Sequence, residues 1–485
     1  MAAEAALHGL KGSLTNKNRG RKMHNSSLEN AAKSGLERLR AGFAVLFLGS
    51  SLLVFAASAH ATLPIQHWQT ASGSRVYFVE NHDLPILDVS VDFAAGSSRD
   101  VPAKAGLAAM TAQMLDLGAG GLSDDEISKR MADVGAALGT RFDLDRAGIS
   151  LRTLSSKAER DQALGVMGKV LQQPEFPEAV LAREKTRTVA ALKEAETQPE
   201  AIADKAFYAA LYGTHPYGLP SSGEVATVSA LTRQDLVDFY DAHYGANGAV
   251  VALMGDVTRA EAAAIAEQLS AKLPKPANAP AALPPVQAPA SAVVRNIAHP
   301  AKQSHILMGY PGMSRVDPDY FSLYVGNYIL GGGGFDSRLT QEVRDKRGLA
   351  YSAYSYFIPY AEQGPFEIGL QTKREQANEA LAVVRKTLAD FVAHGPTQKE
   401  LTQAKNNLIG GFPLRIDSNK KIQEYLAVIG FYQLPLTYLD DFTKSVEKVT
   451  VASIRDAFSR RVQPSRMVTV IVAGPEQGEA PPAVK

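Results

Sequence analysis

The chain repeats one pattern of strands and helices on both sides of a segment rich in proline and alanine. Residues 272–292, KLPKPANAPAALPPVQAPASA, lack helical periodicity and indicate an extended linker. Both halves end alike, with a Thr- or Ser-capped helix, an aromatic residue, a turn and a β-branched strand ending in glycine (LTRQDLVDFYDAHYGANGAVVALMGDVT and VTVASIRDAFSRRVQPSRMVTVIVAGP). A duplicated domain therefore constrains the fold more than any single motif does.

Each half combines strands with long helices. The first half has strand patterns in SRVYFVEN and ILDVSVDFAAGS, two helical segments, and a strand pair in AALGTRFDLDRAGISLRTLS. The second half opens with SHILMGYPG and a helix in YFSLYVGNYILGG, and is helical from Glu375 to about Leu434. These patterns predict an α+β protein of two homologous α/β-sandwich halves, each a mixed sheet with helices on one face. The alternative is two unrelated α/β domains.

The N-terminus indicates export. The segment ERLRAGFAVLFLGSSLLVFAASAHA has two arginines, an apolar run and small residues up to Ala61, which is the layout of a cleaved signal peptide. The alternative is an uncleaved membrane anchor. Cleavage predicts a soluble exported protein, in a bacterial periplasm, with no stable membrane insertion. The expected layout is a targeting segment, a first domain, the linker, a second domain and a tail, at residues 1–61, 62–271, 272–292, 293–476 and 477–485.

The charge of the exported part argues against a polyanionic partner. Of 51 basic and 50 acidic residues, eight and three lie in residues 1–61, so the remainder carries a formal charge of −4. A mildly acidic body gives no electrostatic reason to expect nucleic-acid binding. The chain has no cysteine, so a disulfide framework, a thiol nucleophile and a lipidated cysteine are excluded.

The motifs of common catalytic sites are absent from the sequence. The run GGGGFDSRL, which begins at Gly331, has neither the Lys of a phosphate-binding P-loop nor a glycine at the sixth position of a dinucleotide fingerprint, where Asp336 stands. None of the ten histidines forms an i, i+4 pair on an expected helix, and no G-x-S-x-G elbow occurs. The residues alone therefore predict no metal site and no catalytic centre in this chain.

One longer signature resembles a known family. GGGGFDSRLTQEVRDKRGLAYSAYS is similar to the second-half signature of the pitrilysin/insulinase family of zinc peptidases, whose fold the mitochondrial processing peptidase and the core proteins of the cytochrome bc1 complex share. HPYG at 215–218 and the paired endings also fit, so the resemblance covers about residues 62–475. It implies a two-domain peptidase fold that acts on peptides.

The zinc motif of that family is degenerate here. Active members carry H-x-x-E-H on a helix of the first half, and the matching stretch is GLAAMTAQM, residues 106–114. Ala109 and Gln113 stand at the two histidine positions and Ala112 at the glutamate position. The third ligand of the family is a glutamate roughly 75 residues further on, where KTRTVAAL, residues 185–192, has no carboxylate. Such a helix can neither hold zinc nor activate a water molecule.

The other half of the family's site is present. Active members have an Arg and a Tyr seven residues apart, and Arg344 and Tyr351 match them. Donors of this kind stabilise the oxyanion of a tetrahedral intermediate. Simpler explanations stay open, because Arg344 would also be favourable near a helix C-terminus and Tyr351 in a strand. Arg347, Tyr354 and Tyr356 are expected to be structural or surface residues.

The glycine run itself has two compatible explanations. The resemblance implies a glycine-rich, substrate-handling loop like that of the non-catalytic processing-peptidase subunit, formed by Gly331, Gly332, Gly333 and Gly334. Alternatively, the backbone needs a positive φ after a helix, which glycine adopts with least strain.

A half-site implies a second chain. The resemblance predicts the non-catalytic subunit of a heterodimeric zinc endopeptidase, in which an H-x-x-E-H homologue supplies zinc and the general base. This chain would hold no metal and would contribute Arg344 and Tyr351 to binding a peptide substrate as an added edge strand. The alternatives are a structural or assembly role, as in the bc1 core proteins, and a peptide-binding module that neither cuts nor assembles.

Overall fold

The computed structural model describes residues 64–276 and 281–473. The expected targeting segment, 1–61, and the expected tail, 477–485, lie outside these residues. Leu63–Lys485 form one compact unit by their internal contacts. Within the described ranges, no helix combines the length and the apolar character needed to cross a bilayer.

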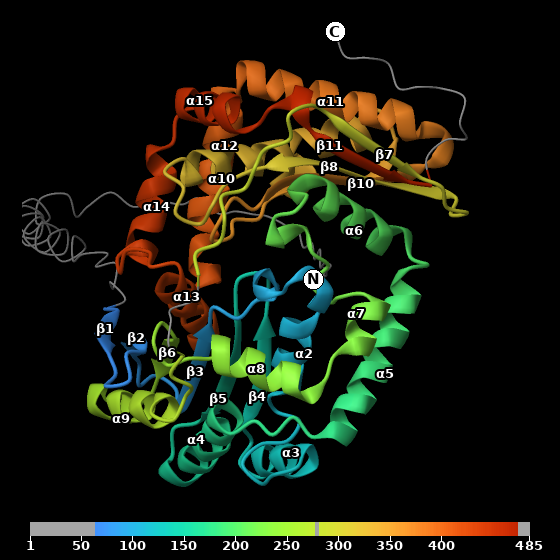
Figure 1. Cartoon of the computed structure of the whole chain (residues 1–485). Helices are drawn as coiled ribbons and strands as arrows, with labels where there is room; N and C mark the ends of the chain where they lie inside the picture. Colours follow the sequence, from blue (N-terminus) through green and yellow to red (C-terminus); the bar gives the residue numbers. More distant parts are fainter. Residues whose placement is uncertain (1–63, 277–280, 474–485) are drawn as a thin grey trace, which may run out of the picture. The chain divides into compact units, whose positions relative to one another are not determined.

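Two mixed sheets form the framework (Figure 1). In the first half the order is β1-β2-β6-β3-β5-β4, with β2 and β6 parallel and the other neighbours antiparallel. Its strands are β1 (Gln66–Gln69), β2 (Arg75–Glu80), β3 (Ile86–Phe93), β4 (Ala137–Phe142), β5 (Ala147–Leu154) and β6 (Val250–Gly255). In the second half the order is β7-β11-β8-β10-β9, with β7 and β11 parallel. Its strands are β7 (Val293–Ile297), β8 (Gln303–Pro311), β9 (Ala350–Phe357), β10 (Pro365–Lys373) and β11 (Val468–Val472).

The two sheets have the same topology. The order β2-β6-β3-β5-β4 corresponds strand for strand to β7-β11-β8-β10-β9, including the parallel pair at the start and the edge strand at the end. Only β1 has no counterpart among the described residues. The predicted mixed-sheet fold and its repetition are therefore confirmed, and β4 and β9 are equivalent edge strands.

Each half covers one face of its sheet with its own helices. In the first half these are α2 (Leu107–Met114), α3 (Asp124–Ala132), α4 (Lys157–Gln172), α8 (Arg233–His243) and α9 (Arg259–Ser270). In the second half they are α10 (Tyr320–Asn327), α11 (Ala377–His394), α12 (Gln398–Gly410), α14 (Tyr438–Lys448) and α15 (Val451–Arg461). Burial of their apolar stripes drives this packing.

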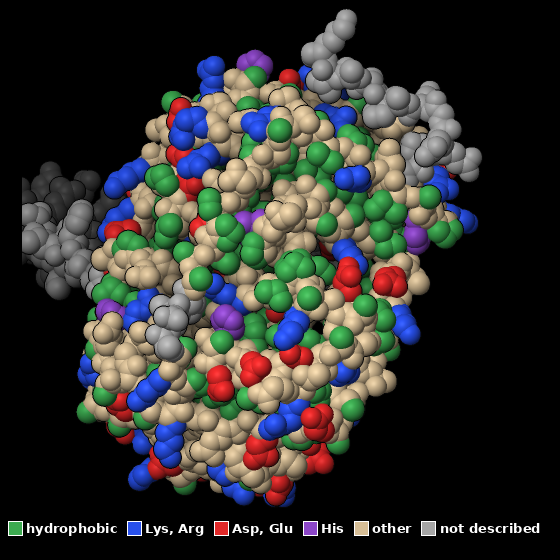
Figure 2. Space-filling view, viewed as in Figure 1, with side chains coloured by type: hydrophobic (Ala, Val, Ile, Leu, Met, Phe, Trp, Pro, Cys, Tyr) green, Lys and Arg blue, Asp and Glu red, His purple; other side chains and the backbone are tan. Residues whose placement is uncertain are grey.

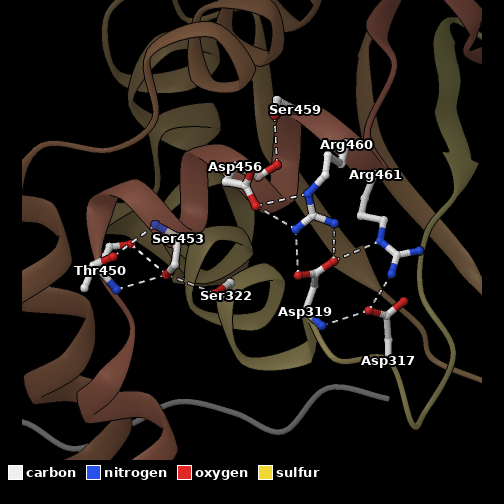
Figure 3. Close-up of polar contacts among 9 residues, drawn as sticks. All are labelled: Asp317, Asp319, Ser322, Thr450, Ser453, Asp456, Ser459, Arg460 and Arg461. Carbon is white, nitrogen blue, oxygen red and sulfur yellow. Dashed lines mark hydrogen bonds and ion pairs between the residues drawn. The ribbon is translucent and has the colours of Figure 1, made fainter.

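Capping fixes where the closing helices start. Thr232 and Thr450 form capping boxes at the N-termini of α8 and α15, where the threonine hydroxyl accepts a backbone N–H of the first turn. Figure 3 shows the α15 box of Thr450 and Ser453, and shows Ser453 bonded to Ser322 of α10. The predicted Thr-capped endings are thus present in both halves.

The second face of each sheet is covered by a helix from the other half. α6 (Pro199–Tyr212) packs on β8 and β11, where a Cβ on Gly309 would lie 2.4 Å from the Phe207 ring. α13 (Asn419–Phe431) packs on β3 and β6, where a Cβ on Gly430 would lie 2.5 Å from Val250 (Figure 1). The sequence predicted helices on one face only, so this reciprocal exchange is new information. The remaining α-helices of the described residues are α5 (Glu178–Ala195) and α7 (Val225–Ala230).

Polar bonds also join the halves. The Asp145 carboxylate, in the turn between β4 and β5, accepts hydrogen bonds from the Tyr217 hydroxyl (2.7 Å), the Tyr432 hydroxyl (2.9 Å) and the Ala361 backbone N–H (2.7 Å). Gln423 of α13 donates to Ser90 of β3 at 2.6 Å. The two halves are therefore tied by both apolar packing and buried hydrogen bonds.

The contact between α6 and the second sheet contains a buried carboxylate. Glu367 of β10 is 8% exposed, and burial together with the nearby charge of Asp204 on α6 raises its pKa to about 7. Burial and Glu200 likewise raise the pKa of Asp204 to about 6. The pKa values of Tyr208, Tyr212 and Tyr354 also respond to Glu367, and all three are raised chiefly by burial.

We expect stability to fall as the pH rises across this range. The pKa of Glu367 is about 7 in the folded protein and near 4.5 in the unfolded chain. Its contribution to stability is therefore complete below pH 4.5 and is lost as the pH rises through 7. Urea unfolding should give a free energy about 2 kcal/mol lower at pH 8 than at pH 5 from this group. Glu367→Gln should flatten that difference, whereas Glu447→Gln, at an exposed site, should not. An unchanged pH profile in the Glu367 variant would contradict the prediction.

Candidate functional site

The glycine run lies where α10 changes its winding. α10 continues as a π-helical turn, Tyr328–Gly332, followed by a short 3₁₀ turn, Gly334–Asp336, and a second π-helical stretch, Thr340–Asp345, that leads into β9. Wide turns of this kind are uncommon and are frequently found at functional sites. The predicted helix and the predicted β-rich segment after it are both present.

Packing and backbone geometry account for the glycines. A Cβ on Gly331 would lie 2.3 Å from the Ser355 hydroxyl oxygen and 2.5 Å from its backbone nitrogen, so β9 leaves no room for a side chain. Gly334 has a φ of +65°, which glycine adopts most easily. A Cβ on Gly332 or Gly333 would also lie within 3 Å of a neighbouring atom. The conformational explanation is thus supported, and contact of these glycines with substrate stays a prediction.

Arg344 and Tyr351 lie side by side. The Arg344 guanidinium carbon is 5.1 Å from the centre of the Tyr351 ring and 4.9 Å from that of Phe335. The guanidinium therefore contacts two aromatic rings, and cation–π attraction favours both contacts. Tyr351 is 85% exposed and Phe335 is 74% exposed, which is unusual for large aromatic residues. Both aromatic rings beside Arg344 are therefore accessible to solvent.

The polar atoms of this stack are free. Within residues 64–276 and 281–473, the side chains of Arg344 and Tyr351 have neither an ion pair nor a hydrogen bond. The neighbouring Arg347 is different, because it donates to the backbone and side-chain oxygens of Glu342, both at 2.7 Å. Arg347 is thus held locally, in agreement with its predicted structural role.

Tyr354 and Tyr356, the other tyrosines of β9, contact neighbouring side chains. Tyr354 faces α6 and fills the space over Gly369, where a Cβ would lie 2.3 Å from its ring. Its ring is 5.2 Å from that of Tyr356, which is 49% exposed. Burial raises the pKa of Tyr354 to about 12, so its hydroxyl stays protonated at neutral pH.

The helix expected to hold zinc in active relatives is α2. Asp100 anchors its start by accepting the backbone N–H groups of Gly106 and Ala108, each at 2.8 Å, and burial raises the pKa of Asp100 to about 7. Ala112 is buried, whereas Ala109 and Gln113 are half-buried. The methyl groups of Ala109 and Ala112 offer no metal ligand, so the helix has lost its donors at these positions.

A carboxylate missed by the sequence analysis contacts Gln113. The Gln113 amide donates to Oε2 of Glu184 at 2.7 Å, and Glu184 is 3% exposed on α5. Glu184 directly precedes the stretch 185–192, to which the family spacing assigns the third zinc ligand. Its other oxygen accepts from Arg183 at 2.9 Å, and Arg187 lies 3.8 Å away. The residues present here do not fit zinc. Among Ala109, Ala112, Gln113 and Glu184, only Glu184 has a carboxylate, and this carboxylate is already bonded to an amide and a guanidinium.

Clusters of metal-ligating side chains are absent from the described residues, because no group of three or more His, Asp or Glu side chains there is arranged to hold a metal ion. On the face shown in Figure 2, Lys and Arg side chains are interspersed with Asp and Glu side chains rather than separated by sign. This face therefore presents no extended field of one charge.

Comparison with known proteins finds two family models that match this chain. Residues 75–224 match the family model described as insulinase (peptidase family M16), and residues 230–408 match the one described as peptidase M16 inactive domain. A crystal structure of a peptidase M16 inactive domain from Pseudomonas fluorescens is 38% identical, with a TM-score of 0.82, and the match covers 86% of this chain and 100% of that one.

The chain belongs to the M16 peptidase family. The resemblance found in the sequence is thereby confirmed. An M16 relative from Helicobacter pylori, the non-peptidase homolog YmxG, is 26% identical over 82% of this chain and 91% of its own length. An uncharacterized zinc protease of Streptomyces coelicolor is 31% identical, over 58% of this chain and 61% of that relative. The chain thus resembles family members named as peptidases and one named as a non-peptidase.

Phe335 is the site residue that sequence reasoning missed. It follows directly on the glycine run, and its exposed ring completes the stack with Arg344 and Tyr351. The signal available in the sequence was a large aromatic residue in a glycine-rich loop, where burial is not expected. The candidate site is therefore a cluster of three residues rather than a pair.

Proposed function

We propose that this M16 protein is the non-catalytic subunit of a heterodimeric zinc endopeptidase. The observation that supports it is the Arg344–Tyr351 pair, held together with free donors, in a chain whose α2 carries Ala109, Ala112 and Gln113 at the zinc-motif positions. A purely structural subunit has no chemical use for an exposed pair of hydrogen-bond donors. A subunit that binds peptides can use such a pair beside the catalytic centre of another chain.

The chemistry of peptide hydrolysis suits these two side chains. Attack on a peptide carbonyl builds negative charge on its oxygen, and positioned donors stabilise that charge. The Arg344 guanidinium is a planar cation with several N–H donors, and the ring contacts with Phe335 and Tyr351 restrict where it can point. In the proposed heterodimer, Arg344 and the Tyr351 hydroxyl donate to the substrate oxygen.

The partner is a homologue with the H-x-x-E-H motif. It supplies the zinc ion and the general-base glutamate that this chain lacks. The peptide substrate adds to an open strand edge, and β4 and β9 are the edge strands at the equivalent ends of the two sheets. Tyr351 lies on β9, and the glycine run 331–334 approaches the same strand, where Gly331 packs against Ser355. Export to a bacterial periplasm, by the segment 1–61, is part of the same proposal.

The purified chain should be inactive by itself. We expect the mature protein to carry no stoichiometric zinc by elemental analysis and to cleave no casein or quenched fluorescent peptide. Addition of an M16 homologue from the same source that carries H-x-x-E-H should produce cleavage that EDTA abolishes. That homologue alone is the matched control.

Two results would overturn the proposal. EDTA-sensitive cleavage by this chain alone would make it a peptidase in its own right. A stable complex whose activity equals that of the homologue alone would favour the structural or assembly role.

A further inference from the structure

A cavity of about 570 Å³ lies in the second half, and its lining does not include Phe335, Arg344 or Tyr351. It is bounded by α10, α13, α14 and the 3₁₀ turn Phe412–Arg415. Its volume is in the range of pockets that hold small organic ligands. Its walls are unusual, because they combine four tyrosines with two arginines: Tyr320, Tyr324, Tyr425, Tyr438, Arg315 and Arg415.

The aromatic walls are flat and ordered. The rings of Tyr320 and Tyr324 are stacked, 6.1 Å apart with an interplanar angle of 11°. Phe442 stands edge-on to Tyr324 at 5.9 Å. Ring faces of this kind favour a flat ligand, which can stack on one ring and meet the edge of another.

The tyrosine hydroxyls add hydrogen-bond donors. The Tyr324 hydroxyl oxygen is buried and has no hydrogen-bond partner among the described residues. A buried unpaired donor is costly unless a ligand or water satisfies it. Burial raises the pKa of Tyr324 to about 12, although the charge and the close approach of Arg415 oppose the shift, so this hydroxyl keeps its proton at neutral pH. The Arg415 guanidinium carbon lies 5.9 Å from the centre of the Tyr324 ring.

The two arginines lack acidic partners. Neither Arg315 nor Arg415 has an ion pair within the described part of the chain, and Nε of Arg315 is buried without a hydrogen-bond partner. The nearest acids in sequence to Arg315 are engaged elsewhere, because Asp317 pairs with Arg461 at 2.9 Å and Asp319 with Arg460 at 2.8 Å (Figure 3).

The acid next to Arg415 is also engaged. Asp417 pairs with Lys421 at 2.9 Å, which removes it as a partner for Arg415. Glu424 is the single acidic side chain that lines the cavity, against Arg315, Arg415 and Lys421. The cavity therefore has an excess of positive charge next to apolar ring faces.

We propose that this cavity binds a small, flat organic anion, such as an aromatic carboxylate. Its ring stacks on the faces of Tyr320 and Tyr324, and its anionic group accepts hydrogen bonds from Arg315 and Arg415. Guanidinium forks match a carboxylate in shape and in charge. A cation is disfavoured by the same two arginines, and a non-planar anion loses the stacking.

The position of the cavity gives an occupant a second contact. α13 forms one wall with Tyr425 and also packs on β3 and β6 of the first half. A bound anion therefore touches the helix that joins the two halves.

Calorimetric titration of the full mature chain tests the ligand class. The probes are 2-naphthoate, the cation 2-naphthylmethylammonium, which has the same rings, and cyclohexanecarboxylate, which has the same charge without a flat ring. We expect 2-naphthoate to bind at one site and both other probes to bind at least about 10-fold more weakly. Absence of 2-naphthoate binding, or equal affinity for the cation, would overturn the proposal.

A matched pair of variants tests the site. Arg415→Gln should weaken 2-naphthoate binding about 10- to 100-fold, the value of a charged hydrogen bond. Arg455→Gln on α15, which is also exposed and has no ion pair within the described residues, should leave the affinity unchanged. Arg415 is exposed, so circular dichroism should show both variants folded. Equal affinity of the two variants would assign the binding to another place and reject this site.

Discussion

In a complex reconstituted with the H-x-x-E-H homologue, Arg344→Ala is expected to lower kcat about 10²- to 10³-fold. This is the usual cost of removing one oxyanion donor. The guanidinium has no other hydrogen-bonding task within the described residues, so its removal should leave the fold intact. Steady-state kinetics on a quenched fluorescent peptide measure the effect, with kcat and KM determined separately because a donor to the transition state acts mainly on kcat.

Three further variants separate the roles within the stack. Tyr351→Phe keeps the ring beside Arg344 and removes only the hydroxyl, so a fall in kcat reports the donor itself. Arg344→Lys keeps the charge and loses the planar fork, and it should recover little activity. Phe335→Ala removes one ring contact of the guanidinium, 4.9 Å away, and is expected to lower kcat less than Arg344→Ala does.

The matched control is Arg347→Ala. Arg347 has the same charge in the same segment, but its guanidinium is bonded to Glu342. Its removal should leave kcat within about twofold, since Glu342 holds this guanidinium by two bonds to Nη1 and so keeps it at a local partner. If Arg344→Ala and Tyr351→Phe also leave kcat unchanged, the pair has no part in hydrolysis and the assembly role becomes the better explanation.

The sequence could predict the repeated sheet because its signals are local. Thr232 and Thr450 sit at the starts of equivalent helices, and each helix is followed by a β-branched strand, β6 or β11. Alternating apolar residues and helix caps depend on near neighbours in the chain. The two matching strand orders follow from one such pattern used twice.

The exchange of α6 and α13 could not be predicted in the same way. An amphipathic stripe shows that a helix packs on something, but does not show which of two equivalent sheets it covers. Each helix lies so close to its sheet that a glycine is needed at the contact. Gly309 lies against Phe207, and Gly430 lies against Val250 and Tyr77, so these contacts link residues more than 100 positions apart. The choice between sheets is made by tertiary packing.

The degenerate zinc site was predicted in part. Ala109, Ala112 and Gln113 lie on α2 as the pattern indicated. The pattern did not indicate Glu184, because this residue precedes the stretch 185–192 to which the family spacing points and its contact with Gln113 spans 71 positions. Phe335 was missed because exposure of an aromatic residue is a property of the folded loop.

Loss of the Asp145 carboxylate should strongly destabilise the fold. Asp145 is 3% exposed and accepts three hydrogen bonds, from Tyr217, Tyr432 and Ala361. Tyr217 is the tyrosine of the HPYG motif, and Tyr432 directly follows α13, so the carboxylate joins the β4–β5 turn to both. Asp145→Ala leaves three donors without their acceptor in a buried place, and we expect unfolding in urea to require about 3–5 kcal/mol less free energy.

The size of this effect depends on burial, which a control can show. Asp133 is also an acid with a hydrogen-bonded partner, Lys129 at 2.8 Å, but that pair is exposed on α3 and its loss should cost about 1 kcal/mol or less. In the double variant Asp145→Ala with Tyr432→Phe, the added cost should be smaller than that of Tyr432→Phe alone, because the hydroxyl has already lost its acceptor. If Asp145→Ala costs no more than Asp133→Ala, the turn tolerates the loss and the halves are held by the exchanged helices alone.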